Sequence, residues 1–143
     1  MLVVIDTNVM IRALARRSPV APLFRALTNG RLGLALSSAI LLEYEAVAAN
    51  LAGPAFAAKL LRIIDLMDTA LGNVTWIDST YRLGVITTDP DDNKFVDCAI
   101  AAAASFIITE DRHFDCLHTA GYQPQPIPPL DFINNHLATS SES

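Results

Sequence analysis

The sequence predicts an α/β fold, a three-layer α/β/α sandwich with a central parallel sheet of four to five strands. Short, continuously apolar runs recur along the chain, and their length and composition are those of strands buried on both faces of a parallel sheet. Segments with helical periodicity separate these runs, as crossovers between parallel strands require. The chain has 143 residues and is 52% apolar, which predicts a single domain with a substantial core.

The first strand is expected at Leu2–Ile5, a four-residue run that is apolar throughout and rich in β-branched residues. Two helical stretches follow, Val9–Arg17 and Ala21–Thr28, and the pair Ser18-Pro19 separates them into a helical hairpin. This arrangement places the start of a helix directly after the first strand.

The middle of the chain repeats this alternation. Gly33–Leu36 is a short apolar second strand, and a serine cap starts a helix that runs from Ser38 to about Asn50. A Gly-Pro pair stops this helix, and a longer amphipathic helix covers Ala55 to about Leu71. Val74–Ile77 is the third expected strand.

The last part of the chain contains the remaining elements. An alanine-rich helix is expected at Asn93–Ala104, followed by a fourth strand at Phe106–Thr109 and a short helix at Phe114–His118. A proline-rich stretch leaves room for only a stub of a fifth strand, Gln125–Ile127, before a last helix at Leu130–Leu137. We expect one domain over residues 1–137 and a disordered, Ser-rich tail at 138–143.

Two acidic residues follow expected strands directly. Asp6 comes after the first strand, and Asp111 stands two residues beyond the fourth. Ligands of open α/β sheets gather at the carboxyl ends of the strands, so both acids are candidates for a functional site. Capping of the next helix is the alternative for Asp6. Glu110 and Asp115 are rivals of Asp111, and helical spacing makes Asp115 an auxiliary acid on the same face.

Two more candidate acids lie on expected helices. Glu43 is about 60° to 70° from the centre of the apolar stripe of its helix, whereas Glu45 is about 130° away and belongs to solvent. A carboxylate at the margin of a buried face is costly unless it is liganded or paired, for example with an arginine. Asp97 lies in the first turns of the alanine-rich helix, where an earlier pair of aspartates is the better cap. The apolar stripe consists of Ile40, Tyr44, Val47 and Leu51.

Acids that converge on one point repel one another and raise each other's pKa unless a cation lies between them. Oxygen ligands without cysteine or histidine suit Mg²⁺ or Mn²⁺, which keep several waters and are completed by a substrate phosphate. Such a site can activate water for phosphodiester hydrolysis. Thr7 and Asn8 can position a phosphate oxygen or a water, or they are only turn residues. His113 and His118 lack the spacing of a zinc protease.

The distribution of charge adds a candidate substrate contact. The formal net charge of −5 argues against general binding to nucleic acid, although five of the ten basic residues lie in the first 31 positions. Arg12 and Arg16 are four residues apart beside Asp6, so they share a helix face and can hold a phosphodiester backbone. A solvated helix face is the alternative. Neither a signal peptide nor a membrane span is indicated, so we expect a cytoplasmic protein.

Four segments occur in a fixed order along the chain: Val4–Asn8, the helical Glu43, Asp89–Ala99 and Ile107–Asp111. Together they resemble PIN domains, in particular the VapC-like toxin components of prokaryotic toxin–antitoxin pairs, over nearly the whole chain. By position, the residues that match the family's acids are Asp6, Glu43, Asp97 and Asp111, with Thr7 or Asn8 as the nearby polar group.

This resemblance implies a Mg²⁺- or Mn²⁺-dependent endoribonuclease selective for single-stranded RNA. It also implies a homodimer, inhibited by a small antitoxin whose tail occupies the active-site groove. The main alternative is a non-catalytic module of the same fold that binds RNA or a protein partner. A haloacid-dehalogenase-type phosphatase would need a second aspartate where Asn8 stands, and a phosphorylation receiver would need a lysine after the last strand; neither requirement is met.

Overall fold

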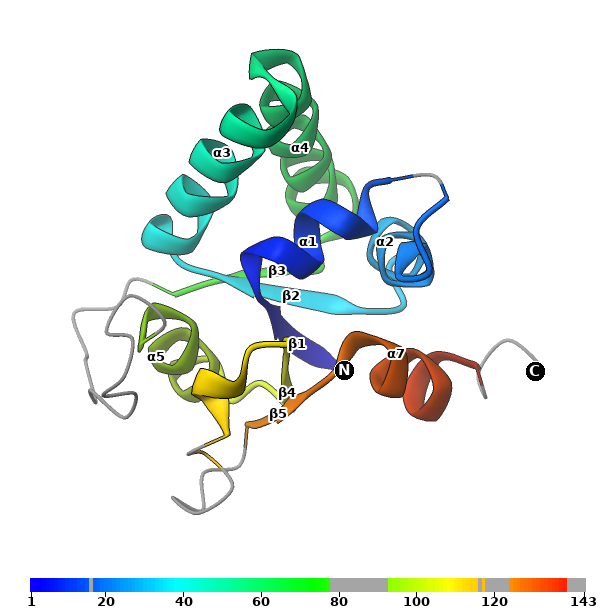
Figure 1. Cartoon of the computed structure of the whole chain (residues 1–143), viewed down its shortest axis with the longest axis vertical. Coiled ribbons are helices and arrows are strands. Elements are labelled where there is room, and N and C mark those ends of the chain that lie inside the picture. Colours follow the sequence, from blue (N-terminus) through cyan, green and yellow to red (C-terminus); the bar gives the residue numbers. More distant parts are fainter. Residues whose placement is uncertain (16, 78–92, 116, 118–123, 139–143) are drawn as a thin grey trace.

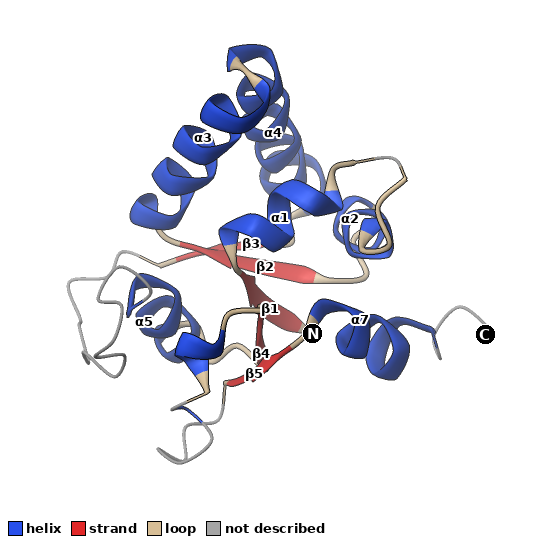
Figure 2. Ribbon diagram, in the orientation of Figure 1, coloured by secondary structure: helices blue, strands red, loops and turns tan. Residues whose placement is uncertain are grey.

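The computed structural model is an α/β/α sandwich around a parallel sheet, and the structure describes residues 1–15, 17–77, 93–115, 117 and 124–138. Figure 1 shows how the elements are arranged, and Figure 2 shows α5 on one side of the sheet and α7 on the other. The strands are β1 Leu2–Ile5, β2 Gly33–Leu36, β3 Val74–Trp76, β4 Phe106–Ile108 and β5 Gln125–Ile127. The predicted fold class is therefore confirmed.

The sheet has five parallel strands in the order β3-β2-β1-β4-β5. Strand β1 lies in the middle, and its residues Val3 to Ile5 are fully buried. It pairs with β4 in the register Val3↔Phe106 and Ile5↔Ile108. This register brings the ends of two strands that are remote in sequence to the same edge of the sheet.

The helices cover the sheet, and their orientation determines which of their side chains point toward its edge. They are α1 Thr7–Ala13, α2 Ala21–Thr28, α3 Ser38–Ala52, α4 Pro54–Leu66 with a π-helical continuation at Met67–Leu71, α5 Asn93–Ala101, a 3₁₀ turn at Arg112–Phe114, and α7 Pro129–Phe132 with a π-helical continuation at Ile133–Leu137. None of the helices in these described segments combines the length and the apolar character that a bilayer crossing requires.

The predicted bounds of two helices were wrong, at both ends of the first and at the end of the alanine-rich helix. The first helix, α1, begins at Thr7 and ends at Ala13, because the backbone N–H groups of Leu14 and Ala15 bond to carbonyls only three residues back, which tightens the last turn. Helix α5 ends at Ala101, three residues before the predicted end. Ala103 has a φ of 55°, the left-handed conformation that closes helices.

Other predictions fall partly outside the described residues. These are Arg16, the C-terminal end of the expected short helix at His118, and the tail beyond Ala138. The stripe predicted for α3 also needs a correction. The buried residues of α3 are Ile40, Tyr44 and Ala48, a spacing of four, whereas Leu51 is 64% exposed because α3 runs past the edge of the core by then.

Helix α3 is attached to the centre of the sheet by Tyr44. This side chain is fully buried, and its hydroxyl donates a hydrogen bond to the carbonyl oxygen of Ile5, the last residue of β1. The start of α3 is capped by Ser37, whose hydroxyl accepts a hydrogen bond from the backbone N–H of Ile40 at 3.3 Å. The register of α3 against β1 is therefore set by a polar contact inside an apolar core.

We expect Tyr44→Phe to lower the free energy of unfolding by about 1–2 kcal/mol, because it leaves a buried carbonyl without this donor while preserving the packed ring. Urea unfolding followed by circular dichroism would measure the change. Glu45→Gln, at an exposed position of the same helix, is the matched control. A loss no larger than that of the control would show that the hydroxyl does not hold α3 to β1.

Candidate active site

The carboxyl ends of β1 and β4 form the centre of the candidate site. Asp6 extends β1 by one residue, and its backbone N–H donates a 3.0 Å hydrogen bond to the carbonyl oxygen of Ile108 at the end of β4. Its carboxylate makes no capping hydrogen bond to α1. Asp6 therefore occupies the N-cap position of α1 without a side-chain capping bond, and its carboxylate has its main hydrogen-bond partner elsewhere.

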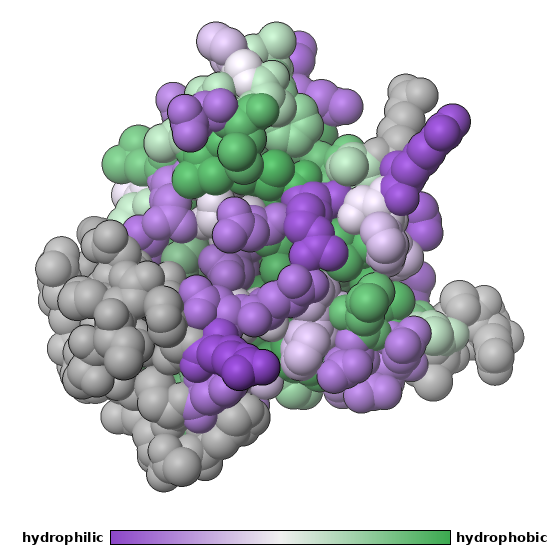
Figure 3. Space-filling model, in the orientation of Figure 1, coloured by the Kyte–Doolittle hydropathy of each residue, from purple (hydrophilic) through white to green (hydrophobic). Residues whose placement is uncertain are grey.

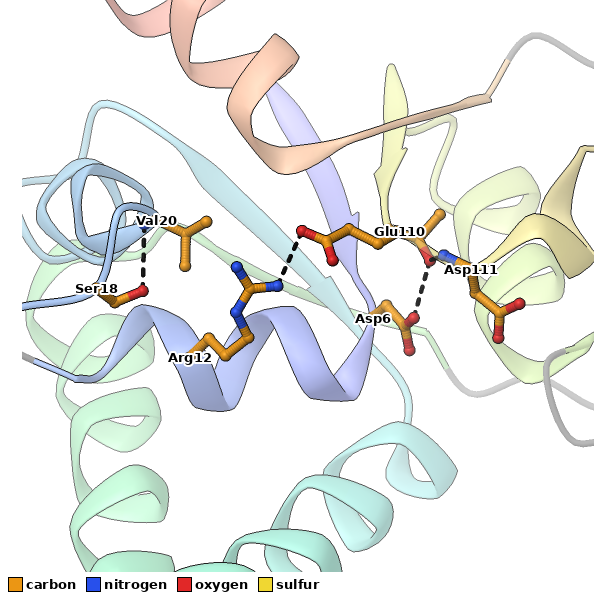
Figure 4. A network of polar contacts seen from close by, with 7 residues as sticks. Asp6, Arg12, Ser18, Val20, Glu110 and Asp111 are labelled. Atoms are coloured by element: carbon orange, nitrogen blue, oxygen red, sulfur yellow. Dashed lines mark hydrogen bonds and ion pairs between the residues drawn. The ribbon is translucent and has the colours of Figure 1, made fainter.

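That partner is Thr109, a buried residue that joins the two strand ends. Its hydroxyl donates a hydrogen bond of 2.8 Å to Oδ2 of Asp6 and accepts one of 2.9 Å from the backbone N–H of Asp111. Figure 4 shows Asp6 and Asp111 near one another at this edge of the sheet. One side chain thus fixes the rotamer of the first acid and the backbone that carries the second. Sequence reasoning took Thr109 only as the last residue of a strand; its position two residues before an acid was the available signal.

Glu43 reaches the same region from α3. The Thr7 hydroxyl donates a hydrogen bond to Glu43 Oε2, and Lys94 Nζ lies 2.6 Å from Oε1. The prediction from helical phase is confirmed, since Glu43 is 28% exposed while Glu45 is solvent-exposed. The pairing alternative involves a lysine rather than an arginine, and Lys94 is not among the predicted site residues.

Asp97 lies on α5, one turn after Lys94, and is only 4% exposed. The adjacent Cys98 is a free, buried thiol; burial and the Asp97 carboxylate raise its pKa to about 12, so it stays protonated and unreactive at neutral pH. Asp111 is half-buried and Asp115 is exposed. These last two acids line one shallow pocket together with Thr109, Glu110, Arg112, Pro126, Ile127 and Pro128.

The remaining candidates lie at the rim. Asn8 is exposed, and Arg12 forms an ion pair with Glu110 at 2.9 Å, with side chains 43% and 52% exposed. Glu110 therefore binds a basic side chain, and an exposed pair of this kind contributes little to stability. Figure 3 shows hydrophilic side chains across the middle of this face, over α1 and the segment after β4, next to an apolar surface over α3. Arg16 lies outside the described residues.

The electrostatics of the site are those of an acidic cluster. Burial is the main reason why the pKa of Asp6 is raised, and the charges of Asp111 and Glu43 raise it further, against the hydrogen bonds from Thr109 and the Thr7 backbone. The oxygen donor set of these acids suits Mg²⁺ or Mn²⁺, and such a cation would relieve the repulsion on Asp6. As placed, no three Asp, Glu, His or Cys side chains of the described residues are close enough to hold a metal ion.

Residues 2–113 match the family described as PIN domain. The fold is similar to a crystal structure of VapBC2 from Rickettsia felis bound to a DNA fragment from their promoter, with a TM-score of 0.57 and 16% sequence identity. That match covers 90% of this chain and 98% of the other, and at this identity it concerns the fold. No curated protein matches the chain significantly.

The raised pKa of Asp6 predicts a specific pH dependence of the metal-free protein. Because the native state binds a proton that the unfolded chain releases, this residue stabilises the fold below its ordinary pKa of 3.8, and the contribution is lost as the pH rises through the raised value. The Asp6→Asn variant has no carboxyl group at this position, so it does not lose this contribution to stability as the pH rises. The stability of the variant relative to the wild type should therefore increase between about pH 4 and pH 7.

Urea unfolding in EDTA across this pH range would measure the difference. Asp65→Asn, at an exposed position of α4, is the matched control for the loss of a carboxylate. A difference between Asp6→Asn and the wild type that stays constant with pH, or shrinks as the pH rises, would contradict the assignment of the raised pKa.

Proposed function

The chain belongs to the PIN domain family, and on that basis we propose that it is a Mg²⁺- or Mn²⁺-dependent endoribonuclease that cleaves single-stranded RNA. The observation that carries this proposal is the Thr109 bridge, which holds Asp6 and the backbone of Asp111 together at the ends of two central strands. Parallel sheets bind their ligands at this edge. Acids that are held at this edge provide the oxygen ligands that a divalent cation requires, and a substrate phosphate can complete its coordination.

In this proposal each side chain has a distinct role. Asp6, Asp97 and Asp111 would hold the metal ion together with Glu43, and a metal ion bound there supplies an activated water and stabilises the departing oxygen. Thr109 orients Asp6, and Thr7 orients Glu43. To hold one ion, the acids of the described residues must move closer together than they lie here. Asp115 is an auxiliary acid, whose exposure allows it to reach a second ion or the water shell.

We also propose that this protein is the toxin of a type II toxin–antitoxin pair. The support is the PIN family membership and the fold similarity to VapBC2, whose structure was solved with a DNA fragment from their promoter. In that case the chain forms a homodimer and is inhibited by a small cognate antitoxin. A non-catalytic PIN-fold module that binds RNA or a protein is the alternative that the experiment must separate.

The function is tested by incubating the purified chain with unstructured RNA and either Mn²⁺ or EDTA. We expect cleavage that requires the metal ion, and Glu43→Gln should slow it by about a hundredfold or more because a carboxylate of the site is neutralised. Glu45→Gln, two residues away on the exposed face of α3, should retain nearly the full rate. Sequencing of the fragment ends would identify the cleavage motif.

Two results would count against this function. Equal losses in the two glutamate variants would show that Glu43 is not part of the site. RNA that is bound but left intact by the wild-type chain at saturating Mn²⁺ would favour the non-catalytic module.

The ion pair between Arg12 and Glu110 at the rim of the site gives a separate prediction for substrate binding. We propose that Arg12 exchanges Glu110 for an RNA phosphate, since both side chains are partly exposed and their ion pair is weak. Arg12→Ala should then weaken RNA binding and reduce the log–log salt dependence by about 0.7, the value for one phosphate contact on a single strand. Glu110→Gln should strengthen binding, because it frees the arginine.

Fluorescence anisotropy at several salt concentrations, in an Asp6→Asn background that prevents cleavage, would measure both effects. Arg25→Ala, at an exposed position of α2, is the control for loss of an arginine remote from the site. If Arg12→Ala and the control give the same salt dependence, the RNA does not contact Arg12.

A further inference from the structure

Glu43, which we propose as a metal ligand, is paired with a cationic side chain of this chain, Lys94. Its Oε1 lies 2.6 Å from the Lys94 ammonium, and its Oε2 accepts the Thr7 hydroxyl, so both oxygens already have a partner. The contact is not a loose surface pair, because the two side chains are only 24% and 28% exposed. A pair that is shielded from water in this way is screened less and costs more to separate than an exposed one.

Lys94 is placed at the site by the fold. It lies in the first turn of α5, one turn before Asp97 and on the same face of the helix, and α5 packs against β1, β4 and α3. Its ammonium is also 5.7 Å from the centre of the Phe95 ring. The chain contains only two lysines, and the other, Lys59, is exposed on α4.

We propose that Lys94 is a built-in counter-cation that competes with the divalent metal ion for Glu43, so that the ion can bind fully only when the ammonium leaves Oε1. This inference rests on the proposed function, since it concerns the same metal ion. Two cations cannot share one carboxylate oxygen without strong repulsion. The flexible four-carbon stem of a lysine allows the ammonium to swing away, and its compact charge makes it a good substitute for a metal ion.

The consequence is a site that is charge-balanced on the α3 side before any metal ion binds, and a metal affinity below what the acids alone would provide. Glu43 is held in one rotamer by Thr7 and Lys94, and the metal ion must compete for it. By contrast, the described residues around Asp6 offer it hydrogen-bond donors and the charges of neighbouring acids, so it should accept a metal ion first.

The test is a Mn²⁺ titration by calorimetry of the wild type, Lys94→Met and Lys59→Met. Methionine keeps the apolar stem of the lysine and removes its charge. We expect Lys94→Met to bind Mn²⁺ tighter by about fivefold or more, a lower bound given by the repulsion of two unit charges about 4 Å apart in bulk water. Lys59→Met should bind Mn²⁺ as the wild type does.

A second measurement uses the wild-type chain and does not depend on how well the variant folds. Reductive methylation read by mass spectrometry compares the two lysines in one sample. Saturating Mg²⁺ should increase the labelling rate of Lys94 several-fold, because its ammonium is released from Glu43, and should leave Lys59 unchanged. A labelling rate of Lys94 that Mg²⁺ leaves unchanged would overturn the inference.

The outcomes separate this inference from the proposed function. If the wild type binds Mn²⁺ and Lys94→Met binds it no tighter, the counter-cation role is wrong and the metal-dependent nuclease stands. If neither protein binds Mn²⁺, both the role and the proposed function fail. Tighter binding by Lys94→Met together with faster labelling of Lys94 in Mg²⁺ would establish the competition.

Discussion

The parallel pairing of β1 with β4 is the constraint on which the rest of the structure depends. It joins the start of the chain to its last third and places Asp6 and Thr109 at one edge of the sheet. The two hydrogen bonds of the Thr109 hydroxyl then fix the positions of the Asp6 carboxylate and the Asp111 backbone at this edge. Helices α3 and α5 add their acids to this edge only because Tyr44 ties α3 to the end of β1, and α5 packs against β1 and β4.

Neighbouring acids in a protein of net charge −5 repel one another. The structure offsets this repulsion differently at each residue. Glu43 is paired with a lysine, Glu110 with an arginine, and Asp6 is held by hydrogen bonds that only partly offset its burial. Among the residues that the structure describes, positive charge is thus paired with acids on the α3 side and at the rim. That distribution suits a site that attracts a small cation strongly and a polyanion only at its edge.

The sequence predicts most of this architecture because the signals are local. The four apolar residues of β1 and of β2 have no alternative to a buried strand, and the predicted bounds match the structure. The phase of α3 separates Glu43 from Glu45 in the same way. What could not be predicted depends on contacts across the sheet. The Lys94–Glu43 pair, the Arg12–Glu110 pair and the Thr109 bridge join residues that are remote in sequence, and no periodicity reports them.

The separation of 103 residues between Asp6 and Thr109 also orders events during synthesis. The first two acids leave the ribosome early, but the central strand lacks its neighbour β4 until the final third of the chain has emerged. Closing such a long loop is slow, and it cannot begin before both ends exist. For a chain that we propose cleaves RNA, this topology means that the candidate site can be assembled only late in translation.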